Sequence, residues 1–464
     1  MMDVSQEEIT NGSVTRSLLI LAGPLVLQNL VQVFQQVADL FWLGRLSTAA
    51  VAAIGLNFPI IGVLTIAVVG IFVGTQVLVS QRVGQENYSN ARNAVFHGIL
   101  LAVGIHSLVA ILLYLFATPI IRLVSLYTIT PSVTELAATY LGIWGFALIP
   151  ASMSDALEAG YVGWGDSRAA LYINVIAVVT NIVLDPFFIF GYGPFPRLEI
   201  AGAAIATVLG YTAGFLVAIG MLIPGRKEYR LTLDELEIRI GDFRSLIDIG
   251  APNAGEHLAS QSIRVVIIGL VSVVGGSVGL AAYAIGARVA SIAFIPASGL
   301  QQAAQSIIGQ NIGAENPNRA ARTTWIGAGL AAVGLTIFAG IQWIFPAVLA
   351  NIFVPTLTGP ELRLTVTYLR ILAYGYWAIG ALYLFLAGFN GVRRTRTSMI
   401  ITLIQYWAVR LPAAFIGAII FDYGIVAIFW AVTISNIVAA IGAGTYYWYK
   451  TSQGMQLQAV ENIG

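Results

Sequence analysis

Long apolar runs alternate with short polar breaks along almost the whole chain. Each run is close to or above the roughly 20 apolar residues that a helix needs to cross a bilayer. Read between glycines, prolines and charged residues, the runs predict six helices near 17–43, 50–79, 94–118, 133–156, 168–190 and 200–223. Six more are predicted near 246–272, 279–308, 323–347, 364–388, 397–420 and 424–448. The pattern therefore predicts an all-α integral membrane protein with twelve transmembrane helices.

Composition supports a membrane protein and excludes several classes of function. Of the 464 residues, 58% are hydrophobic and 10% are charged, against roughly 25% charged residues in soluble domains. The formal net charge of +1 gives no reason to expect nucleic acid as a partner, and the absence of cysteine excludes disulfides, thiol catalysis and cysteine-bound metals. The polar, acidic N-terminus is unlike a cleaved signal peptide, so we expect the first apolar run to be retained.

The distribution of basic residues predicts the orientation of the chain. If the N-terminus is cytoplasmic, the inner loops hold thirteen Arg or Lys residues and the outer loops hold four. Cytoplasmic loops of membrane proteins carry such an excess of positive charge. We therefore expect a multi-pass protein of the cell membrane with both termini in the cytoplasm.

The turns and helix breakers of the two halves match, which indicates an internal repeat. Pro24 pairs with Pro252 and Pro186 with Pro412, while SQRVGQENYSNAR pairs with GQNIGAENPNRAAR, all at offsets of 226 to 229. Because each half has an even number of helices, both enter from the same side of the membrane. The predicted organisation is an N-terminal segment 1–16, a six-helix lobe 17–223, a linker 224–245, a second six-helix lobe 246–448 and a C-terminal tail 449–464, with a cleft between the lobes.

Several of these stretches carry a family resemblance. The segments QNLVQVFQQVADLFWLGRLSTAAVAAIG, VSQRVGQEN, IGQNIGAEN and TNIVLDPFFIFGYG resemble the multidrug and toxic compound extrusion (MATE) transporters, and in particular their archaeal, DinF-like branch. The resemblance implies two pseudo-symmetric six-helix bundles in a V shape. It also implies export of small organic cations or amphiphilic drugs in exchange for Na⁺ or H⁺. We expect a monomer that needs no cofactor.

Acidic residues inside the predicted spans are the candidate site, because ionisable groups in the membrane interior usually face a cavity and act there. Asp185 and Asn181 are four residues apart and so share a helix face, where their oxygens suit Na⁺ or a proton. Asp39 lies deep in the first span, and the resemblance places it at the same lobe cavity. Alternatively, Asp39 marks the outer interface, and the Asn181–Asp185 pair only fixes the kink at Pro186.

The resemblance adds Thr207 and Tyr140 to this site, together with a polar residue of the fourth helix. Either Asp155 or Glu158 could supply that group, or both acids could line the inner vestibule. A Na⁺ ion could then be held by Asp155, Asn181, Asp185 and Thr207.

The second half carries intramembrane arginines whose role the sequence leaves open: Arg264, Arg288, Arg370 and Arg410. We expect Glu256 to be a structural partner of Arg264 or Arg288, and coupling to use the first lobe.

The same arginines keep a lipid-linked oligosaccharide flippase as an alternative. An intramembrane enzyme is a rival from another class, for which no DDxxD, HExxH or GxSxG arrangement is found. A channel or a receptor would not need paired carboxylates in one lobe. Neither the physiological substrate nor the choice between Na⁺ and H⁺ follows from the sequence.

Overall fold

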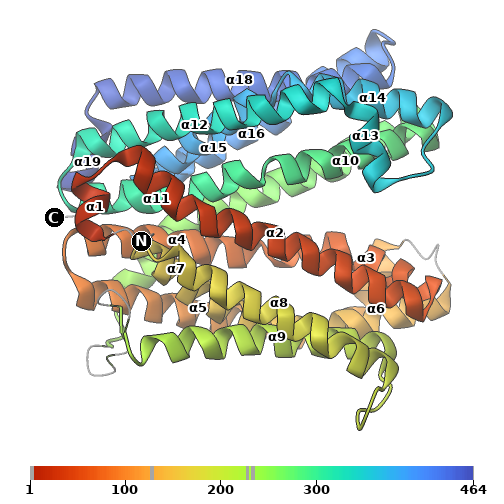
Figure 1. Cartoon of the computed structure of the whole chain (residues 1–464), viewed down its shortest axis with the longest axis horizontal. Helices are drawn as coiled ribbons and strands as arrows, with labels where there is room; N and C mark the ends of the chain where they lie inside the picture. The colour runs from red at the N-terminus through yellow and green to blue at the C-terminus, as the bar shows by residue number, and fades with distance from the viewer. Residues whose placement is uncertain (1–4, 126–129, 226–228, 231, 233–235, 463–464) are drawn as a thin grey trace. The chain divides into compact units, whose positions relative to one another are not determined.

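The fold is helical, as the sequence predicts. The computed structural model describes residues 5–125, 130–225, 229–230, 232 and 236–462 (Figure 1). Within them, ten helices are long and apolar enough to span a membrane, or eleven if the pair Gly359–Ala373 and Tyr376–Gly391, bent by 49°, forms one span. The 54-residue helix α10 (Ile240–Ala293) contains non-helical backbone at Gly276 and is therefore two segments joined at a kink. The exact count of twelve spans stays a prediction.

The chain divides into two compact units. The first unit holds Leu27–Ala254 and the second holds Glu7–Val26 with Gly255–Gly464. Both dividing points fall inside helices, because α2 (Val14–Leu46) and α10 each supply residues to both units. The predicted lobe boundaries, and the linker 224–245 that lies partly outside the described residues, stay predictions.

In the first unit, α8 and α9 pack along each other and both contact α7 (Figure 1). Polar caps start several of its helices: Ser47, Asn87 and Asp166 each accept a hydrogen bond from a backbone N–H in the first turn of the helix that follows. Its complete helices are α3 (Thr48–Leu64), α4 (Ile66–Gly84), α5 (Tyr88–Val124), α6 (Pro131–Trp144), the 3₁₀ turn η1 (Gly145–Ala147), α7 (Leu148–Gly163), α8 (Ser167–Phe190) and α9 (Glu199–Leu222).

In the second unit, α12, α15, α16 and α18 lie side by side (Figure 1). Two stretches between α16 and α18 are π-helical, η3 (Ile404–Arg410) and η4 (Ile416–Ile420). The other helices are α1 (Gln6–Asn11), α11 (Ile295–Gly313), α12 (Pro317–Ile344), α13 (Pro346–Phe353), α14 (Gly359–Ala373), α15 (Tyr376–Gly391), α16 (Thr395–Leu403), α17 (Leu411–Phe415), α18 (Ile425–Ser452) and α19 (Met455–Glu461).

The turns that the sequence pairs have the same backbone structure. Glu86 and Glu315 adopt left-handed conformations with φ of 59° and 57°, which few non-glycine residues do. The next residue in each turn, Asn87 or Asn316, donates its N–H to the carbonyl five residues earlier, at 2.9 and 2.7 Å. The repeat predicted from sequence therefore extends to the hydrogen bonds of its turns.

A glycine sets the distance between α8 and α9. A Cβ atom at Gly210 would lie 2.7 Å from the Ala177 carbonyl oxygen and 2.9 Å from Cβ of Asn181. Only glycine permits this approach, and membrane helices commonly pack through small residues. The contact holds the Asn181 side of α8 directly against α9.

Buried polar contacts fasten the beginning of α10 to the α4–α5 turn. Arg82 forms an ion pair with Asp242, and its guanidinium also donates to the Asn90 carbonyl at 2.7 Å. The buried His97 ring accepts the backbone N–H of Arg239 through Nε2 at 2.9 Å. These contacts fix the last residues before α10 within the first unit.

Candidate functional site

Two carboxyl groups face each other inside the first unit. The side chains of Asp39 on α2 and Asp185 on α8 lie close enough to interact directly, and Asp185 is only 1% exposed. No N–H or O–H donor among the described residues reaches either Asp185 oxygen. Two carboxyl groups can bond directly only through a proton on one of them. A proton, or a cation in its place, therefore completes this pair.

Amide and hydroxyl groups surround the acid pair. In one orientation of the Asn181 amide, its oxygen accepts from Gln35 Nε2 at 2.9 Å and its nitrogen donates to Thr207 Oγ1 at 3.4 Å. In the other orientation, its nitrogen lies 3.1 Å from Asp39 Oδ1 and donates to it. The side chains of Tyr140 and Thr207 also hydrogen-bond. The structure thus brings together five of the seven residues that the sequence singled out.

Glu158 of α7 belongs to a second polar layer, which it forms with residues of α2 and α8. Its carboxylate accepts hydrogen bonds from Gln28 Nε2 at 2.5 Å and Asn174 Nδ2 at 2.6 Å. Gln32 Nε2 donates to the side-chain oxygen Oδ1 of Asn174 at 2.9 Å. Asn174 precedes Asn181 by seven residues, about 10 Å along α8 at 1.5 Å per residue. Two polar layers therefore follow one another along this helix.

Asp155 joins neither layer by a hydrogen bond among the described residues, although it interacts electrostatically with Glu158. Tyr211 of α9 is half-buried and interacts electrostatically with both Asp155 and Asp39, so it lies near both acids. Four residues of these layers were not predicted from the sequence as site residues: Tyr211, Gln35, Gln28 and Asn174. Helical spacing offered one signal, because Gln35 precedes Asp39 by four residues and Tyr211 follows Thr207 by four.

In the second unit, the predicted partner of Glu256 is wrong. No ion pair among the described residues joins Glu256 to Arg264 or Arg288; its carboxyl group instead hydrogen-bonds Thr402. Glu256 and Arg264 share a helix face, but eight residues separate them by about 12 Å along the axis.

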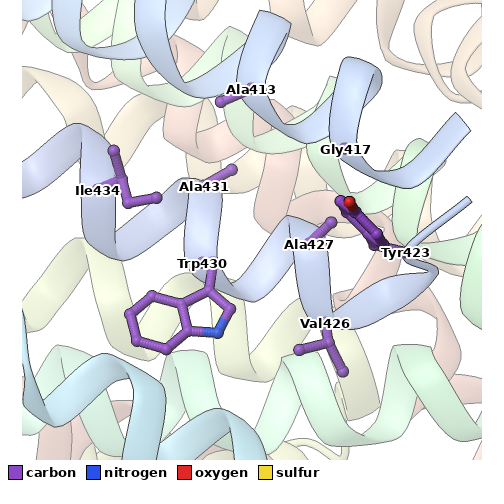
Figure 2. A pocket seen from close by; sticks show the side chains of 8 residues that line it. All are labelled: Ala413, Gly417, Tyr423, Val426, Ala427, Trp430, Ala431 and Ile434. Carbon is purple, nitrogen blue, oxygen red and sulfur yellow. The ribbon is translucent and has the colours of Figure 1, made fainter. Parts of the chain in front are cut away.

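A groove of about 340 Å³ lies in the second unit, where Ala413 and Gly417 lie opposite Ala427 and Ala431 of α18 and the Trp430 ring points to the other side of that helix (Figure 2). Its wall carries no acidic or basic side chain and consists of Ala413, Gly417, Tyr423, Val426, Ala427, Trp430, Ala431 and Ile434. The groove lacks the groups that binding a cation requires, so the acid pair of the first unit remains the candidate site.

The match to a protein family settles the class of the protein. The model of the family described as MatE matches residues 24–187 and again residues 252–416. The chain belongs to the MatE family. The two matches begin at Pro24 and Pro252, the prolines that the internal repeat pairs, and so confirm the duplication. Members of this family are transporters, so the chain is a transporter and not an enzyme.

Relatives of this MatE protein match over most of their length. The chain is 27% identical to the FAD transporter of Shewanella oneidensis over 88% of each chain. It is 26% identical to the probable multidrug resistance protein NorM of Thermotoga maritima, over 92% of this chain and 90% of that one. A solved structure of an outward-facing multidrug resistance MATE family transporter covers 100% of both chains at 20% identity with a TM-score of 0.87, and so shares the fold. The DinF-like branch within the family stays a prediction.

Proposed function

We propose that this MatE protein is an antiporter that exports small organic cations and amphiphilic drugs in exchange for Na⁺ or H⁺, with the Asp39–Asp185 pair as its coupling site. It resides in the cell membrane with both termini in the cytoplasm, acts as a monomer and needs no cofactor besides the coupling ion. The observation that carries the proposal is the pair itself, because two carboxyl groups face each other and neither Asp185 oxygen receives an N–H or O–H donor from the described residues.

The coupling follows from the charge of the pair. Two unit charges 4 Å apart repel by roughly 4 kcal/mol at an effective dielectric constant of 20. Binding of Na⁺ or a proton removes this repulsion and lets Asp39 on α2 approach Asp185 on α8. The position of α2 in the first unit then depends on ion occupancy, and this dependence links ion entry to substrate release.

For Na⁺, the oxygens of Asp185, Asn181 and Thr207 supply ligands of the kind that hard cations prefer. The hydrogen bonds that join these groups to one another and to Tyr140 and Asp39 support a common site. Asp155 stands apart from this group, and Glu158 is held by two amides. We propose that these two acids form an inner station for the ion, on the way between the coupling pair and the cytoplasm.

The names of the relatives suggest a range of transported molecules to test. One is described as a multidrug resistance protein and another as an FAD transporter. We propose that the cargo of this chain is an amphiphilic organic molecule, and that the range to be tested includes molecules with an acidic group.

The experiment is transport of an organic cation dye by purified protein in vesicles, under separately imposed Na⁺ and H⁺ gradients. The wild type moves dye with one of the gradients. Asp39→Asn and Asp185→Asn keep the amide or hydroxyl neighbours but remove the charge, so both should lose gradient-driven transport by at least about tenfold. Glu135→Gln, at an exposed acid of α6, is the matched control and should transport like the wild type.

The result that would overturn the proposal is equally direct. If both asparagine variants insert normally, unfold at the wild-type temperature and still move dye against its gradient, the pair does not couple ion to cargo.

A further inference from the structure

The second unit places positive charge where the first unit places its acid pair. The helix pairs α6–α7 and α14–α15 begin at a constant offset of 228, and both contain the run Thr-Tyr-Leu, which pairs Tyr140 with Tyr368. Tyr140 interacts electrostatically with the two acids of the coupling pair. Its counterpart Tyr368 interacts with the guanidinium of Arg410. The repeat has therefore kept the tyrosine and inverted the charge beside it.

The prolines of the repeat place Arg410 near the position equivalent to Asp185, one residue out of register. Asp185 directly precedes Pro186, and Arg410 stands two residues before Pro412. Arg410 also ends the π-helical stretch η3. Such stretches interrupt α-helices mostly at functional sites, because the wider turn redirects a side chain.

The neighbours that hold the Arg410 guanidinium are all neutral. Nε donates to Ser435 Oγ at 2.9 Å and Nη2 donates to Asn436 Oδ1 at 2.6 Å. Gln405 donates to the same Asn436 oxygen at 2.9 Å, and the Tyr406 ring centroid lies 4.4 Å from the guanidinium carbon. These contacts orient the group and leave its charge in place.

A second guanidinium lies in the same region. Tyr283 interacts electrostatically with both Arg410 and Arg264. No carboxylate among the described residues forms an ion pair with either arginine. Glu256 is the acid of this neighbourhood, since it and Arg264 both act on Tyr383. Two guanidinium groups against one carboxyl group leave the cluster with an excess of positive charge.

A stack of aromatic rings packs beside these charges; Tyr283 at its edge is half-buried, and Tyr368 and Phe429 are buried. Tyr283 and Tyr368 stack with their centroids 5.5 Å apart and an interplanar angle of 14°. Tyr368 stacks on Phe429 at 4.1 Å. Aromatic rings bind flat apolar bodies, and the planar guanidinium fork matches the oxygens of a carboxylate or phosphate.

An uncompensated charge in a membrane-spanning segment is costly and is usually kept for a ligand. We propose that Arg410 and Arg264 form an anion-binding subsite in the second unit, which takes the carboxylate or phosphate group of a transported amphiphile. The substrate class is thus an aromatic or apolar body that carries an acidic group. Transport of the bound molecule rests on the function proposed above, whereas its binding does not.

The test compares two molecules that share one ring system. FMN carries a phosphate that riboflavin lacks, and both are fluorescent and water-soluble. Binding is measured by fluorescence titration of the protein in nanodiscs of neutral phosphatidylcholine. The wild type should bind FMN at least about tenfold more tightly than riboflavin, because a charge-assisted bidentate bond contributes that much affinity. Equal affinities would overturn the proposal.

Variants then locate the preference. Arg410→Gln and Arg264→Gln should each lower FMN affinity by about tenfold and leave riboflavin binding unchanged. Arg410→Lys keeps the charge and should retain part of the preference. Arg370→Gln is the matched control, because its guanidinium lies over the exposed Trp343 ring instead, 5.6 Å from the centroid. A preference for FMN that survives in both glutamine variants would place the anion elsewhere and overturn the assignment.

Two further arms distinguish the source of the anion. Nanodiscs that contain phosphatidylglycerol test a lipid headgroup, and inorganic phosphate tests a free ion. The subsite is assigned to a cargo if FMN binds equally well in both lipids and millimolar phosphate competes only weakly. Loss of FMN binding in phosphatidylglycerol, or full displacement by millimolar phosphate, would overturn the assignment to an amphiphile.

The asparagine variants of the coupling pair separate this proposal from the proposed function. Asp185→Asn should bind FMN as the wild type does, even though its gradient-driven transport is lost. Arg410→Gln should lose the FMN preference but still move an organic cation dye, which also shows that the variant is folded. If Asp185→Asn still transports dye, the coupling proposal fails and the FMN measurements decide the subsite independently.

Discussion

Glu158 and Asp185 are both buried acids of the first unit, yet their surroundings call for different roles. Two side-chain amides donate to the Glu158 carboxylate, whereas neither Asp185 oxygen receives a donor from the described residues. A carboxylate that has its donors is stable as a charged group, and one that lacks them needs a proton or a cation. The distinction depends on which side chains meet in space, and the one-turn spacing of Asp155 and Glu158 could not reveal it.

We therefore expect Glu158→Gln to affect stability more than ion dependence. The substitution replaces charge-assisted hydrogen bonds and leaves an amide facing the Asn174 amide, at a cost of about 1–3 kcal/mol. The unfolding temperature should fall and the transport rate should drop several-fold, while transport still requires the same ion gradient. Glu135→Gln serves as the control. If Glu158→Gln abolishes the ion requirement, Glu158 belongs to the coupling pair's own site.

At the scale of elements, the apolar runs predicted where helices lie but not how they bend or pack. The breaks between α6 and α7 and between α14 and α15 fall in apolar stretches, near residues 145–147 and 374–375, so hydropathy gives no signal there. The π-helical turns of η3 and η4 likewise leave the apolar pattern unchanged. The paired turns were predictable, because the sequences GQEN and GAEN stand at matching positions of the repeat.

The α8–α9 contact offers a test at this scale. Gly210→Ala places a methyl group 2.7 Å from the Ala177 carbonyl oxygen and 2.9 Å from Cβ of Asn181. The two helices must separate, which should cost about 1–3 kcal/mol as overpacking does. Asn181 then moves away from Thr207, so coupled transport should fall several-fold. Thermal unfolding and vesicle transport measure both effects.

Gly220→Ala on the same helix is the matched control. No heavy atom lies within 4 Å of a Cβ built there, so we expect unchanged transport and stability equal to or slightly above the wild type, since alanine favours a helix by about 1 kcal/mol. Equal behaviour of the two alanine variants would show that the close approach of α8 and α9 does not position the site.

At the scale of the whole molecule, the sequence predicts two halves but not which residues pack in each unit. The first residues of α2 belong to the second unit, and the first residues of α10 belong to the first unit. Hydropathy identifies a helix as membrane-spanning without indicating its neighbours, so this exchange had no signal in the apolar pattern. The internal repeat did give a signal for this exchange, because Pro24 and Pro252 stand close to the two dividing points, Val26 and Ala254.

Orientation in the membrane is testable on the same scale, and the chain suits the experiment because it contains no cysteine. We expect Pro194→Cys and Pro355→Cys to react with a membrane-impermeant maleimide in intact cells, because both positions are exposed in predicted outer loops. Asn11→Cys and Glu461→Cys, exposed near the two termini, should react only after permeabilisation. The opposite labelling pattern would place the basic loops outside. It would also reverse the depths of Asp39 and Asp185, and the ion would then reach the acid pair from the cytoplasm.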